Sequence, residues 1–172
     1  QLIKDYLQQY PSRSFTLFHL GQDLIPYLDN HYHHDDKDIV LEIAQYHWAK
    51  MSTSFARHLP GLKPHTLTDP SHLYCKPLIC QAHLQFIQLM QPHWFKKGAA
   101  APIYMAIYQW QYRVKELELE EIEYQIFQSI LEGQTLEQIM QTIATHYKDP
   151  KLEQKIQTWF QRAIRLEWFI EI

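Results

Sequence analysis

Four side chains near the carboxyl end fall on one face of a predicted helix. Three are basic and one is aromatic, and their spacings are four, four and three residues: Lys151, Lys155, Trp159 and Arg162. Side chains at these spacings are neighbours on an α-helix surface. Such a basic strip can contact phosphates, or the acidic side chains of a peptide that lies along the helix. Alternatively, the cations are merely solvated on an outer face and Trp159 caps the core.

A second candidate site is the segment 31–36, which holds three histidines and two aspartates: His31, His33, His34, Asp35 and Asp36. These residue types suit zinc, nickel or iron. Ligands within one short loop rarely converge on a metal, however, and the chain has no helical His-Glu-x-x-His motif. We therefore predict no metal here, and expect Asp35 or Asp36 to favour the start of the following helix.

The sequence carries no other motif typical of catalysis or cofactor binding. It lacks a glycine-rich phosphate loop, a Gly-x-Ser-x-Gly turn and a facial triad of metal ligands. Cys75 and Cys80 do not have the spacing of a zinc knuckle, and we expect free thiols in a cytoplasmic protein. The sequence therefore predicts no cofactor and no catalytic residues.

The basic strip belongs to the last of three helices that follow two predicted strands, 103–109 and 112–118. Glycine at 133 ends the first helix, Thr135 with Gln138 forms a capping box for the second, and Asp149 starts the third. The order β-β-α-α-α is typical of a winged-helix-like module. Such a module either places its last helix in DNA or offers its sheet edge and the adjacent groove to an extended peptide.

The residues before this module follow helical patterns. We predict an α+β protein with an all-α helical domain at 1–66, a linker at 67–80 and the winged-helix-like domain at 81–172. Ser14 is expected to cap a helix that continues to Leu28, and Pro26 is expected to kink or shorten it. The chain begins within a helical pattern, so we expect it to be a piece of a longer protein.

Charge separates the two uses of the module. From residue 101 to 172 there are seven Lys and Arg against eleven Asp and Glu, a net charge of −4. DNA binding takes most of its nonspecific affinity from neutralised phosphates, which an acidic module forgoes. The sequence has no apolar run long enough for a membrane span and no visible signal peptide. These patterns favour a peptide-binding protein, with DNA binding as the alternative.

The carboxyl-terminal pattern resembles a known family. The runs 119–133, 135–139 and 165–169 are similar to the PqqD-like recognition elements that bind leader peptides of ribosomally made, modified peptides. In that family two or three strands precede three helices, and the leader adds as a strand between the sheet edge and the third helix. From the fold pattern we expect peptide pairing along Val114, Lys115, Glu116 and Leu117. The leader's side chains would then contact Lys151, Lys155, Trp159 and Arg162.

The amino-terminal part resembles a second family. The runs 10–14, 20–21, 25–28 and 46–49 are similar to the helical domain of HvfC-type proteins, with MbnC as a distant relative. The segments 84–90 and 103–108 match that family in the same order, although its first helices have no counterpart here. Members usually have Glu before the Trp of the long helix, where this chain has His47.

This second resemblance implies a non-catalytic accessory subunit. HvfC-like proteins pair with an iron-dependent oxidase of the MbnB or HvfB type, which converts cysteines of a precursor peptide to oxazolone and thioamide groups that bind copper. The chain would hold the precursor near the metal centre of its partner in a heteromer. The alternative from a different class is a transcriptional regulator whose last helix reads DNA.

Overall fold

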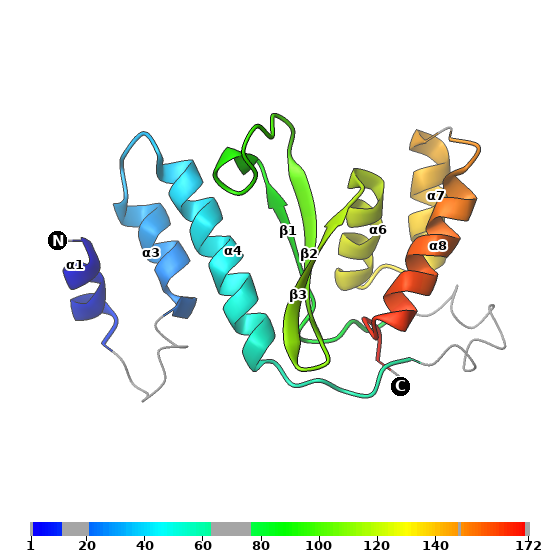
Figure 1. Ribbon diagram of the computed structural model, residues 1–172, viewed down its shortest axis with the longest axis horizontal. Coiled ribbons are helices and arrows are strands. Elements are labelled where there is room, and N and C mark those ends of the chain that lie inside the picture. The colour runs from blue at the N-terminus through cyan, green and yellow to red at the C-terminus, as the bar shows by residue number, and fades with distance from the viewer. Residues whose placement is uncertain (1, 12–20, 63–76, 148, 171–172) are drawn as a thin grey trace.

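A computed structural model of the chain describes residues 2–11, 21–62, 77–147 and 149–170. Within these ranges the protein contains six α-helices and one three-stranded antiparallel sheet, which confirms the predicted α+β class. Figure 1 shows the helices in layers, with α4 on one side of the sheet and α6, α7 and α8 on the other.

Three α-helices of the described residues precede the sheet: α1 (Leu2–Gln9), α3 (Leu24–His31) and α4 (Lys37–Phe55). Pro26 lies in the first turn of α3, where its missing N–H is not needed by the helix. The predicted cap at Ser14 lies outside the described residues. Asp36 occupies the N-cap position of α4 as expected, but its side chain makes no capping hydrogen bond.

The sheet has the order β1-β2-β3, formed by β1 (Gln85–Leu89), β2 (Ile103–Trp110) and β3 (Arg113–Leu119). Two of these strands match the predicted ones, and β1 adds a third that the strand prediction omitted. The turn between β2 and β3 places Gln111 and Tyr112 at φ of 50° and 61°. Two central residues with positive φ are typical of the tight turns that suit the twist of a hairpin.

Both faces of the sheet are buried, and each packs against different helices. On one face, side chains of β1 and β2 pack against Tyr46 and Ala49 of α4. On the other, Ala106, Tyr108 and Leu119 join the core formed with the later helices. The helix α4 therefore contributes to the same sandwich as the sheet, and the division into two domains remains a prediction.

The last three helices are α6 (Glu121–Leu131), α7 (Leu136–His146) and α8 (Leu152–Arg165). The predicted punctuation is confirmed in two places. Gly133 has a φ of +84° after α6, and Thr135 with Gln138 forms a complete capping box for α7. The third predicted start, at Asp149, lies just before α8. The Asp149 side chain accepts a hydrogen bond from the Lys151 N–H at 2.9 Å, and Lys151 occupies the N-cap position of the helix.

The residues that follow α8 pair with two segments from earlier in the chain. Phe169 bridges to Cys80 and Ile170 bridges to Gly61, both in antiparallel fashion. The main-chain N–H of Leu62 donates to the Phe169 carbonyl at 2.8 Å. Residues 61–62 of the predicted helical domain and Cys80 at the end of the predicted linker thus pair with the same terminal segment, while residues 67–76 of that linker lie outside the described residues.

Candidate functional site

The strand β3 forms one edge of the sheet, and its last residue, Leu119, shares a core with side chains of α8. Lys155 of α8 donates to the carboxylate of Glu120, the residue after β3, at 3.0 Å. Further along α8, the positive charge of Arg162 partly offsets the rise that burial causes in the pKa of the Tyr108 hydroxyl, and Tyr108 pairs across the sheet with Lys115. Within the described residues, no strand pairs with the outer side of β3.

The face of β3 that points toward α8 changes character along its length. Its four side chains are Arg113, Lys115, Leu117 and Leu119, at every second position. Both cations are exposed, whereas Leu117 is half-buried and Leu119 is buried in the core. A strand added here would meet positive charge at the hairpin end and apolar surface at the other end.

On the opposite face of β3, the negative charges of two glutamates are neutralised by lysines from other parts of the protein. Glu116 forms an ion pair with Lys50 of α4 at 2.5 Å, and this hydrogen bond is the main reason that the Lys50 pKa is raised. Glu118 pairs with Lys96 at 3.2 Å. Val114 is half-buried and packs against the hydrophobic cluster that includes Tyr46 and Ala49 of α4. Of the four predicted pairing residues on β3, Lys115 thus has an exposed side chain without an ion-pair partner among the described residues.

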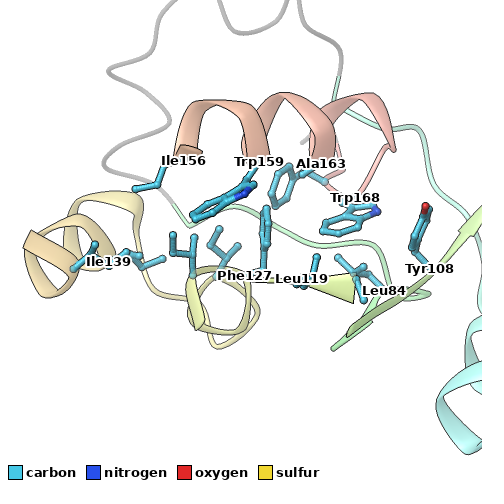
Figure 2. Packing of buried hydrophobic residues seen from close by; sticks show 14 of the residues in the cluster. Leu84, Tyr108, Leu119, Phe127, Ile139, Ile156, Trp159, Ala163 and Trp168 are labelled. Carbon is cyan, nitrogen blue, oxygen red and sulfur yellow. The ribbon is translucent and has the colours of Figure 1, made fainter. Parts of the chain in front are cut away.

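The predicted contacts on α8 are less available than their spacing suggests. Trp159 is only 5% exposed, and Figure 2 shows it pointing from α8 into the core over α6 and α7. This placement favours the core role of Trp159 over contact with a peptide. Lys155 is held by Glu120 and by Asp149, whereas Lys151 is exposed in the turn before the helix.

Arg162 is part of a partly buried ion pair. Its Nη2 donates to Oε1 of Glu123, whose side chain is 2% exposed, while the Arg162 side chain is 28% exposed. Burial raises the pKa of the Glu123 carboxyl, and the nearby guanidinium partly offsets that rise. The same guanidinium acts on Tyr108, where burial raises the hydroxyl pKa and the positive charge lowers it. Arg162 therefore stabilises an internal carboxylate and presents only part of its side chain outward.

The histidine-rich segment is organised by its own contacts. The ring of His31 stacks on Tyr27 with centroids 4.3 Å apart, and the Tyr32 hydroxyl donates to Asp36 at 2.9 Å. Across the described ranges, no cluster of three or more His, Cys, Asp or Glu has the arrangement of a metal site. The described thiol, that of Cys80, is free, and burial raises its pKa to about 12.

A chain of polar side chains that the sequence did not indicate joins three distant segments. The Gln109 N–H donates to Nδ1 of His83 at 3.1 Å, so neutral His83 carries its proton on Nε2. That proton is donated to Nδ1 of His58 at 2.9 Å, and Nε2 of His58 then donates to Glu167 at 3.0 Å. His83 is fully buried, and desolvation is the main reason that its pKa is lowered to about 4.

Glu42 is a second buried polar group that the sequence did not single out. Its carboxylate accepts from the Met90 N–H at 2.7 Å, the Gln91 N–H at 3.0 Å and Nε1 of Trp94 at 2.9 Å. These bonds fasten the segment after β1 to α4. This contact could not be predicted from the sequence, because Glu42 is separated from its donors by about fifty residues. A glutamate inside a helical pattern normally predicts a solvated face.

No protein-family model matches the chain, and no curated protein has a significantly similar sequence. No helix in the part of the chain that the structure describes is both long and apolar enough to cross a bilayer.

Proposed function

We propose that this chain is a non-catalytic accessory subunit that binds an extended peptide as an added strand along β3, beside α8. One observation carries the proposal: β3 is an edge strand whose following residue, Glu120, is held by Lys155 of α8, and no described strand pairs with its outer side. An exposed edge offers a row of main-chain donors and acceptors to an incoming peptide. Pockets or charges for alternate side chains then supply the specificity.

The arrangement of elements gives the proposal further support. Three strands followed by three helices is the order that the resemblance to leader-recognition elements implies. The long helix α4 packs on the far face of the sheet, and no described strand pairs with the outer side of β3. A peptide held there would gain a high effective concentration near an enzyme bound to the same subunit.

The proposed partner is an iron-dependent oxidase of the MbnB or HvfB type, and the proposed peptide is its ribosomally made precursor. The oxidase would convert precursor cysteines to oxazolone and thioamide groups of a copper-binding product. The role of this chain is to hold the leader so that the reacting cysteine lies near the metal of the partner. We further propose that the complex is cytoplasmic, in keeping with the free thiol of Cys80.

Hydrogen exchange with and without a leader peptide tests the proposal directly. The probe is the leader of a precursor encoded beside this chain, mixed with the full chain. We expect slower exchange across β3, while β1, the other edge of the same sheet, keeps its rate and serves as an internal control. Absence of leader binding, or protection that spares β3, would contradict the proposal.

The DNA-binding alternative has weaker support from the charges on α8. Lys155 and Arg162 are each paired with a carboxylate of the same chain, so they offer little free charge to phosphates. Lys151 and Arg165 remain exposed. If this chain nevertheless binds duplex DNA, its affinity should fall steeply as salt is raised.

A further inference from the structure

The cations beside β3 differ in whether the protein has already neutralised them. Lys155 is paired with Glu120, and Arg162 with Glu123. By contrast, Arg113 and Lys115 are exposed, and neither has an ion-pair partner among the described residues. Free positive charge next to the strand edge is therefore concentrated at its hairpin end.

These two cations also have a fixed spacing. They stand two residues apart on the face of β3 that points toward α8, where their cross-strand partners are Trp110 and Tyr108. Side chains two residues apart on a strand are separated by roughly 6.8 Å. A paired strand presents its own alternate side chains at the same spacing, so two acidic residues in the pattern acidic-x-acidic would face both cations at once.

The rest of the β3 face that carries Arg113 and Lys115 favours apolar side chains in a bound peptide. Leu117 is half-buried and Leu119 is buried, so the next two alternate positions of a paired peptide would meet apolar surface. On the other face of β3 the two glutamates are compensated by Lys50 and Lys96, which removes any comparable preference there. The charge pattern thus distinguishes one register of the added strand from its neighbours.

We propose that the peptide recognised at this edge carries two acidic residues separated by one position, with apolar residues at the next alternate positions on the same face. The acidic pair lies opposite Arg113 and Lys115, and the apolar pair lies against Leu117 and Leu119. This inference rests on the proposed strand addition and specifies its ligand. A one-residue slip would turn the acidic pair to the opposite face, so the pair sets the register.

Display selection with random twelve-residue peptides tests this inference on the full chain. The same library is selected against the wild-type protein, the Arg113→Glu/Lys115→Glu variant and a control, Lys4→Glu/Lys97→Glu. The control reverses two exposed cations that belong neither to β3 nor to α8. We expect acidic-x-acidic peptides from the wild type and the control, and basic-x-basic peptides from the β3 variant.

Synthetic peptides from the selection then give the size of the effect. Opposite-charge pairs across strands predict about tenfold tighter binding for the acidic peptide than for its Gln-x-Gln counterpart. Enriched peptides that lack the acidic spacing, or that stay the same after charge reversal, would overturn the inference but leave strand addition intact. If no peptide is enriched above bare resin, strand addition itself is contradicted.

Discussion

Replacing Arg162 with alanine should destabilise the protein, because Glu123 would lose the guanidinium that its buried carboxylate faces. The Glu123 side chain is 2% exposed, so water cannot replace the lost partner. Removing one member of a buried ion pair typically costs 3–5 kcal/mol, and we expect about 3 kcal/mol because Arg162 itself is partly exposed. Equilibrium unfolding in urea at pH 7.5 measures this difference.

The pH dependence separates an electrostatic cost from simple loss of packing. Burial already raises the pKa of Glu123 in the folded protein, and removal of Arg162 should raise it further. A carboxyl whose pKa is higher in the folded than in the unfolded state contributes stability at low pH and loses it as the pH rises. The cost of Arg162→Ala should therefore be largest near pH 8 and shrink as the pH falls toward the ordinary glutamate pKa.

Two further variants complete this experiment. Arg165→Ala removes an exposed arginine from the same helix and should change stability by less than about 0.5 kcal/mol. The double variant Glu123→Gln/Arg162→Ala should recover part of the loss, because it leaves no buried charge. The reasoning is refuted if Arg162→Ala costs less than about 1 kcal/mol, or if its cost stays constant from pH 4 to pH 8.

This prediction also changes how peptide binding should be tested. Arg162 was an attractive ligand contact from its helical spacing, but its variants would mix loss of binding with loss of stability. Substitutions at Lys115, which is exposed and has no ion-pair partner within the described ranges, avoid that ambiguity.

Other predictions concern the polar links between segments. Glu42→Ala should cost about 3 kcal/mol in urea unfolding, because three partly buried donors lose a charged acceptor. Gly61→Ala should cost about 1–3 kcal/mol in the same assay, since an added Cβ would lie 2.6 Å from Cβ of Glu167. The lowered pKa of His83, about 4, predicts that its stabilising effect is present above pH 6.5 and lost as the pH falls from 6.5 to 4; nuclear magnetic resonance of the imidazole nitrogens should find it neutral at pH 5.5. Lys50→Met should cost less than about 1 kcal/mol, because the pair with Glu116 is near the surface.

Local signals in the sequence were sufficient for much of the carboxyl-terminal half. Gly133 and the Thr135–Gln138 capping box act within a few residues, so their effect could be predicted without knowledge of the fold. The runs 103–109 and 112–118 likewise identified β2 and β3, because a short apolar run and a stretch that alternates polar and apolar residues are both typical of strands. The strand β1 was missed because its five residues carry glutamines at both solvent-facing and packed positions.

Features that depend on distant partners could not be predicted in the same way. Trp159 and Arg162 share a helix face with Lys155, yet the indole packs in the core and the guanidinium pairs with Glu123. Helical spacing gives only the angular position of a side chain, and the neighbouring element decides whether that angle faces water or protein. The hydrogen-bonded side chains of His83, His58 and Glu167 could not be predicted for the same reason. They belong to segments far apart in the sequence that meet only in the folded protein.

The distribution of ion pairs gives the helical part a role beyond support. Lys50 of α4 neutralises Glu116, and Lys96, from the segment that Glu42 of α4 fastens, neutralises Glu118. Without them, Glu116 and Glu118 would present free negative charge on the opposite face of β3, so the edge would select cations there as well as anions beside α8. With them, the free charge on the strand is reduced to Arg113 and Lys115 on the side of α8. If peptide selection depends on these ion pairs, Lys50→Met should add a preference for a basic residue at the peptide position that faces Glu116 and retain the acidic pair, and Lys97→Met should leave the selection unchanged.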